Sequence, residues 1–104
     1  MSTRRPRYRY IAFRVEGPRA FRREEVFEAI RSAPERLWLV EFRHPLGLVR
    51  TTHLTKDAAI RALVGIGTMA GERVRVTTVG TSGTIRAATR KYLVHAGGVG
   101  KEPL

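Results

Sequence analysis

The stretch Leu-Trp-Leu-Val-Glu-Phe-Arg-His-Pro-Leu-Gly-Leu-Val-Arg-Thr-Thr-His, residues 37–53, contains two extended segments joined by a turn. Residues 37–42 form a short apolar run bounded by charged residues, which predicts a central strand. The tetrapeptide His44-Pro45-Leu46-Gly47 contains the turn formers Pro and Gly, and it leads into a second strand at residues 48–53. The stretch therefore predicts a β-hairpin in the middle of the chain.

A strand and a helix are expected before this hairpin. In residues 8–15, every second side chain suits a buried face and the others suit the opposite face. This period of two predicts a strand. Val26 and Ile30 then fall at helical spacing among charged residues, which predicts an amphipathic helix that ends by Pro34.

A helix, a strand and a further helix are expected after the hairpin. Thr55 is a suitable N-cap for a second helix, which Gly65 ends. Residues 73–79 predict a fourth strand, and Gly80 is expected to stop it. The polar run that follows then opens a third helix, which extends to about Leu93.

The predicted order is β-α-β-β-α-β followed by a C-terminal helix. This order is typical of the ferredoxin-like sandwich, an α+β fold in which an antiparallel four-stranded sheet carries helices on one face. The length favours a single domain over residues 1–104, with a basic arm at 1–7 and a flexible tail at 96–104.

The charge balance predicts a polyanionic partner. The formal net charge is +11 in 104 residues, and seventeen of the twenty cationic side chains are Arg. Such a surplus gives sequence-independent affinity for phosphate backbones, and the planar guanidinium also stacks on bases. A genome that favours Arg codons would explain the ratio of Arg to Lys equally well, but it does not explain the net charge. We therefore expect an RNA-binding domain.

Three residue types are missing from the chain, namely Cys, Asn and Gln. Without Cys there are no disulfides, thiolate metal sites or thiol nucleophiles, and a cytoplasmic location is expected. Without the amides that usually read adenine edges, binding should depend on phosphate and shape. The same absences are typical of thermophilic proteins. No apolar stretch is long enough for a membrane span, so no membrane partner is expected.

The strongest local feature is Val-Gly-Thr-Ser-Gly-Thr-Ile-Arg, residues 79–86, where a strand is expected to end and a helix to begin. Free backbone N–H groups and the positive end of the helix dipole would converge there and form a phosphate seat. Arg86 and Arg90 are four residues apart and are expected to share one helix face. A capped helix with a solvated basic face is the equally weighted alternative.

The second candidate is the exposed face of the sheet, where aromatic and cationic side chains could stack unpaired bases. It would be lined by Tyr8, Tyr10, Arg14, Arg50, Thr52, Arg75 and Thr77. We expect the tyrosines to pack beneath the third helix or a protein partner, and Arg50 to contact nucleic acid. Trp38 is expected in the core.

The ferredoxin-like sandwich is also the fold of an enzyme class, the acylphosphatases. Acylphosphatases place an Arg in the loop after the first strand, where this chain has Gly17-Pro18-Arg19. They also need an Asn on a later strand, and this chain has none, so the activity is not expected. The three histidines lack the spacing and companions of a metal site, and no cofactor is expected to bind the protein.

Four segments together resemble the second protein component of archaeal ribonuclease P. They are residues 9–15, 37–42, 47–53 and 79–93, and the last, which ends in Arg-Lys-Tyr-Leu, is the most specific. The resemblance covers most of the chain in the same order.

The resemblance implies a noncatalytic subunit of the ribonucleoprotein that removes 5′ leaders from precursor tRNA. In that family the RNA is the catalyst and uses Mg²⁺, the protein stabilises the RNA with protein component 3 as its partner, and contact with precursor tRNA is indirect. Carried over residue by residue, the RNA-binding positions are Arg50, His53, Ser82, Thr84, Arg86, Arg90 and Lys91. The alternatives are a general RNA-binding or ribosome-associated protein, and a scaffold for an acidic protein partner.

Overall fold

The computed structural model describes the backbone of residues 7–94 and the side chains of residues 7–93. The expected flexible tail and all of the expected basic arm except Arg7 lie outside the described residues. The elements are β1 (Tyr8–Glu16), α1 (Arg23–Arg31), β2 (Trp38–Arg43), β3 (Leu46–Thr52), α2 (Lys56–Val64), β4 (Thr68–Met69), β5 (Glu72–Arg73), β6 (Arg75–Ser82), α3 (Ile85–Ala88) and the π-helix η1 (Thr89–Val94). Within residues 7–94, no helix has the length and apolar character to cross a membrane.

The main sheet has the strand order β2-β3-β1-β6, and every neighbouring pair is antiparallel. This arrangement confirms the predicted ferredoxin-like sandwich. The prediction of a central strand at residues 37–42 is wrong, because β2 is an edge strand. The apolar run suggested burial on both faces, yet the buried side chains of β2 are only Leu39 and Phe42, and Trp38 is 61% exposed. The expectation of a core tryptophan is therefore also wrong.

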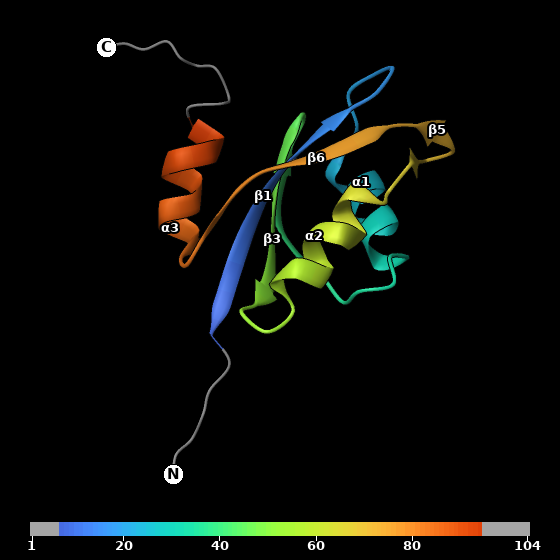
Figure 1. Cartoon of the computed structure of the whole chain (residues 1–104). Coiled ribbons are helices and arrows are strands. Elements are labelled where there is room, and N and C mark those ends of the chain that lie inside the picture. Colours follow the sequence, from blue (N-terminus) through green and yellow to red (C-terminus); the bar gives the residue numbers. More distant parts are fainter. Residues whose placement is uncertain (1–6, 95–104) are drawn as a thin grey trace.

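Helices α1 and α2 cover one face of the sheet and enclose the main hydrophobic core (Figure 1). The alternation in β1 places Ile11, Phe13 and Val15 on this face, and all three are fully buried. They belong to the same cluster as Val26 of α1 and Leu63 of α2. Complete burial of a side chain of this kind contributes about 1.5–3 kcal/mol, so this layer supplies most of the driving force for folding.

The C-terminal helical segment packs on the opposite face of the sheet (Figure 1). Helices α1 and α2 thus share one face, as the sandwich predicts, and the third helix covers Tyr10 on the other face, one of the two arrangements expected for the tyrosines. Ala88 of α3 lies in a second buried cluster with Tyr10 and Leu48, and Tyr92 packs against it. The segment therefore has a separate, smaller core on the other side of the sheet.

Gly80 does not stop the fourth strand, contrary to prediction, since β6 continues to Ser82. Gly80 pairs with Ala12 inside the sheet, and a Cβ atom at position 80 would overlap the ring of Tyr92. The glycine is required for this close approach of η1. The register shifts next to it, so that Val79 has no directly opposite residue and is exposed.

A two-residue hairpin, β4 and β5, precedes β6 and was not predicted. Gly71 lies in its turn with a φ of +80°, a conformation that glycine adopts without strain. Because the hairpin takes Glu72 and Arg73, the long strand begins at Arg75, two residues later than expected.

Candidate nucleic-acid interface

The passage from β6 to α3 is fixed by the N-cap residue Thr84. Its backbone is extended, and its Oγ1 accepts a hydrogen bond from the backbone N–H of Ala87 at 3.1 Å. A threonine N-cap contributes about 1 kcal/mol to the stability of a helix end. Ser82, also expected at the RNA surface, is the last residue of β6 and pairs with Tyr10. The predicted phosphate seat at this junction stays a prediction, and the α-helical part that follows is a single turn.

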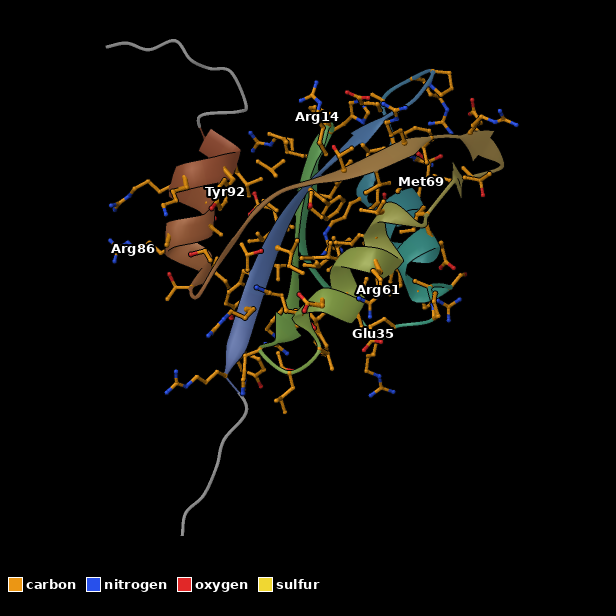
Figure 2. All side chains as sticks on the ribbon, viewed as in Figure 1. Arg14, Glu35, Arg61, Met69, Arg86 and Tyr92 are labelled. Atoms are coloured by element: carbon orange, nitrogen blue, oxygen red, sulfur yellow. The ribbon has the colours of Figure 1, made fainter. Side chains whose placement is uncertain are left out.

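The helical segment separates apolar from cationic side chains. Figure 2 shows Tyr92 directed toward the sheet, whereas Arg86 points away from it. The side chains of Arg86, Arg90 and Lys91 are exposed, and Ala88 between them is fully buried. Because the helix widens from α to π at Thr89, Arg90 and Lys91 lie about one turn beyond Arg86. The three predicted cations thus occupy the outer surface of one short segment.

No carboxylate neutralises this outer surface within the described residues. Four ion pairs are found among the described residues, namely Arg14–Glu16, Arg19–Glu25, Arg19–Glu72 and Arg31–Glu28. None of them involves a cation of α3 or η1. Residues 73–94 contain five cationic residues, namely Arg73, Arg75, Arg86, Arg90 and Lys91, and no Asp or Glu. The surface thus carries concentrated positive charge that a polyanion would neutralise.

Arg50 lies between two exposed aromatic rings on the same sheet face as the third helix. Its Cζ is 4.3 Å from the ring centroid of Tyr8 and 4.9 Å from that of Trp38. Both separations are within the range of cation–π attraction. Tyr8 is 47% exposed and is not covered by the third helix, so its packing against a protein partner stays a prediction, whereas Tyr10 is buried beneath that helix as expected.

Trp38 is the residue of this site that sequence reasoning missed. A signal existed in the hairpin, since pairing across the turn places Trp38 directly opposite Arg50. Side chains of directly opposite residues share a face of the sheet. Arg50 also pairs with Tyr10, which pairs with Ser82, so one row connects the aromatic cluster to the start of α3. The Cα atoms of Arg50 and Ser82 are about 10 Å apart at ordinary strand spacing.

His53 lies just past the end of β3 and is exposed. Its Nδ1 is 3.2 Å from the backbone nitrogen of Arg7 and 3.3 Å from the backbone oxygen of the same residue. Its backbone N–H donates to the Arg7 oxygen at 2.8 Å. His53 therefore anchors the chain just before β1, and Nε2 is the ring nitrogen that remains for a ligand.

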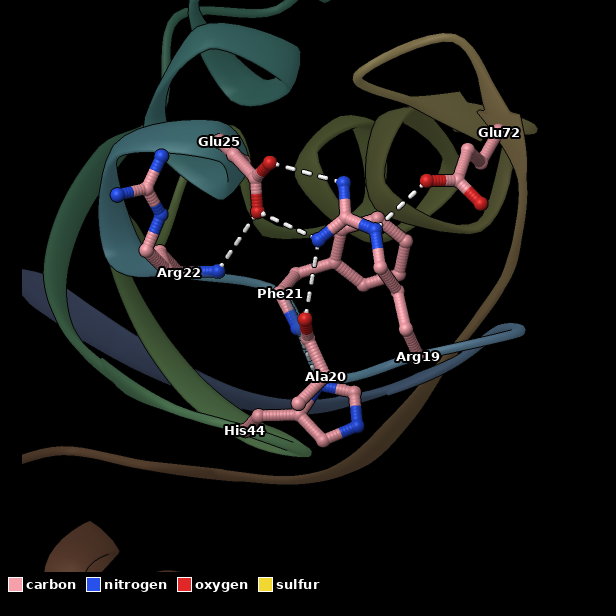
Figure 3. Close-up of polar contacts among 7 residues, drawn as sticks. All are labelled: Arg19, Ala20, Phe21, Arg22, Glu25, His44 and Glu72. Atoms are coloured by element: carbon pink, nitrogen blue, oxygen red, sulfur yellow. Dashed lines mark hydrogen bonds and ion pairs between the residues drawn. The ribbon is translucent and has the colours of Figure 1, made fainter.

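The loop that resembles an acylphosphatase loop is occupied by a structural ion-pair network (Figure 3). Arg19 Nε donates to Glu72 at 2.6 Å, and Arg19 Nη2 donates to Glu25 at 2.9 Å. The hydrogen bond from Arg19, assisted by the backbone N–H of Arg22, lowers the pKa of Glu25 to about 2. With these carboxylates bound, Arg19 is engaged in holding the loop to α1 and β5.

Three comparisons identify relatives of the chain. Residues 31–93 match the model of the Rpp14/Pop5 family. The chain is 32% identical to ribonuclease P protein component 2 of Thermococcus gammatolerans, over 91% of this chain and 90% of the relative. It is 33% identical to the protein of the same name from Halorubrum lacusprofundi, over 90% of this chain and 70% of the relative.

A solved structure has the same fold. It is a chain in the cryo-EM structure of yeast ribonuclease MRP, with a TM-score of 0.60 and 11% identity over 91% of this chain and 92% of that one. The sequence matches are stronger evidence of kinship than the shared fold, because each covers most of both aligned chains at about one-third identity. The resemblance noted from the sequence is confirmed: the chain belongs to the Rpp14/Pop5 family, together with the archaeal ribonuclease P protein component 2 proteins.

Proposed function

We propose that this protein is a noncatalytic subunit of ribonuclease P that binds the catalytic RNA and stabilises its fold during 5′-leader removal from precursor tRNA. The observation that carries the proposal is the cationic surface of α3 and η1, which no carboxylate of residues 7–93 neutralises, in a chain of this family. Phosphate contacts of this type supply affinity without base identity, which suits a protein that supports an RNA fold.

In this proposal the packing of α3 and η1 determines where the cations lie. The buried cluster around Ala88 and Tyr10 fixes the segment on the sheet, so Arg86, Arg90 and Lys91 are presented together. The row of paired residues extends the surface to Arg50. The RNA would hold the Mg²⁺ used in catalysis, protein component 3 would be the protein partner, and contact with precursor tRNA would be indirect. A cytoplasmic location belongs to the same proposal.

Reconstituted cleavage of precursor tRNA by the cognate RNA, at limiting Mg²⁺, tests this function. We expect the protein to raise the cleavage rate, because neutralising phosphates lowers the RNA's demand for Mg²⁺. The variant Arg86→Ala/Arg90→Ala should lose much of this effect. The matched control is Arg36→Ala/Arg61→Ala, which removes the same charge from exposed positions outside α3 and η1.

The outcomes separate the proposal from its alternatives. An unchanged cleavage rate with the wild-type protein would contradict the proposal. RNA binding without any effect on cleavage would favour a general RNA-binding or ribosome-associated protein. Capture of an acidic protein that survives nuclease treatment, again without an effect on cleavage, would favour the scaffold.

A further inference from the structure

The cluster of Tyr8, Arg50 and Trp38, called here the aromatic platform, is a second surface on the sheet. Its three residues come from adjacent strands, with Arg50 on β3 between Tyr8 on β1 and Trp38 on β2. Both rings are strongly exposed, at 47% for Tyr8 and 61% for Trp38. Exposed apolar side chains that are scattered singly are ordinary, whereas rings gathered in one patch, as these two are around Arg50, more often mark an interaction site.

We propose that the aromatic platform binds an unpaired nucleobase of a single-stranded RNA segment, which stacks on Trp38. This inference rests on the proposed RNA-binding function and names the kind of RNA element that this part of the surface recognises. It goes beyond phosphate neutralisation, because the stacking energy comes from the face of a base.

The first support is the chemistry of the platform. An indole ring stacks on any base, since every base has a π-face, and an adjacent guanidinium adds cation–π attraction. No hydrogen bond or ion pair of Arg50 is found within the described residues, and its Cζ lies 4.3 Å and 4.9 Å from the two ring centroids. The N–H groups of Arg50 therefore remain for a phosphate or for a base edge beside the stacked ring.

The second support is continuity with the cationic surface. Trp38, Arg50, Tyr10 and Ser82 form one row of paired residues across the sheet. The third helix covers this row at Tyr10, and the exposed platform lies directly beside the covered part. From Ser82 to Trp38 this row crosses three strand spacings, about 14 Å, so an RNA strand whose phosphates contact α3 would need to extend by only about three nucleotides to place a base on Trp38.

Trp38 is the only tryptophan in the chain, so its fluorescence reports directly on the platform. The probes are a ten-nucleotide oligouridylate and an abasic ribose-phosphate strand of the same length and charge. We expect the oligouridylate to quench the fluorescence and to bind roughly tenfold more tightly than the abasic strand, a difference that reflects stacking. An equal affinity for the two strands would overturn the proposal.

Two variants test whether the difference in affinity between the two strands arises at Trp38. Trp38→Ala should reduce the affinity ratio of the two strands to near one, whereas Trp38→Phe should retain part of it. The control is Val64→Ala, which removes another exposed apolar side chain, on α2 and away from the platform, and should leave the ratio unchanged. A ratio that survives Trp38→Ala would overturn the proposal, and a circular dichroism melt shows that each variant is folded.

The same titrations distinguish the platform from the proposed function. If the chain binds both strands equally and Arg86→Ala/Arg90→Ala weakens both, the platform fails and the phosphate-binding surface stands. If neither strand binds in dilute salt, both proposals fail. Quenching by oligoglutamate but not by oligouridylate would overturn the platform in favour of an acidic protein segment.

Discussion

Replacing Gly80 by Ala should weaken the attachment of the third helix to the sheet. A Cβ atom at this position would overlap the ring of Tyr92, whose hydroxyl also lies 3.4 Å from the backbone oxygen of Thr81. Overpacking of this kind generally costs about 1–3 kcal/mol. Because the atoms in the way are at the tip of a half-buried ring, which can swing outward, we expect a value near the lower end, about 1 kcal/mol.

The assay is equilibrium unfolding in urea, followed by circular dichroism, for Gly80→Ala in two backgrounds. In the wild-type background the free energy of unfolding should fall by about 1 kcal/mol. In a thermal melt the same loss corresponds to a fall in Tm of about 4–8 °C. With Tyr92→Ala already present, no ring occupies the space, and Gly80→Ala should be neutral or stabilising by up to about 1 kcal/mol because alanine suits a strand better. An equal cost in both backgrounds would refute the packing argument.

Further predictions concern the cap, the core and pH. Thr84→Ala should lower the free energy of unfolding by about 1 kcal/mol, measured in urea, because the first helical turn loses its capping oxygen; an unchanged value would exclude the cap. Gly47→Ala should cost at least as much as Gly80→Ala in the same assay, about 1–3 kcal/mol, since its Cβ would meet the ring of fully buried Phe13, which cannot swing away; a neutral result would contradict this packing. Burial, assisted by a nearby guanidinium, lowers the pKa of His44, whose Nδ1 accepts from the backbone N–H of Phe21 at 3.2 Å. The stabilising contribution of its neutral form is therefore complete above about pH 6.5 and is lost as the pH falls through the lowered pKa of the folded state; an NMR titration should find that pKa below 6.5, and a value at or above 6.5 would contradict the burial.

The period of two in β1 predicted both the strand and its buried face correctly, because local alternation directly reflects a two-sided sheet. The position of β2 at the sheet edge could not be predicted in the same way. An apolar run indicates burial, but strand order depends on contacts between distant segments. The apolar run therefore predicts a buried Trp38, whereas the side chain is exposed beside Arg50.

Gly80 shows a second limit of local sequence reasoning. A glycine after a β-branched run is typical of a strand end, whereas here it allows Tyr92, twelve positions later, to approach the sheet. The outward position of Arg86 followed from helical spacing, but the change from α to π geometry at Thr89 did not, because no local residue signals it. Sequence therefore identified the cations of the candidate site, and the structure determined how they are arranged with the sheet.

The central claim is that the cations of α3 and η1 bind phosphates, and the salt dependence of RNA affinity tests it most directly. The titration compares the wild-type protein, Arg86→Ala/Arg90→Ala and the control Arg36→Ala/Arg61→Ala on one RNA from low to moderate salt. Loss of two phosphate contacts should make the slope of log affinity against log salt shallower by about 1.5 units in the first variant only. An unchanged slope, or an equal change in the control, would contradict the claim.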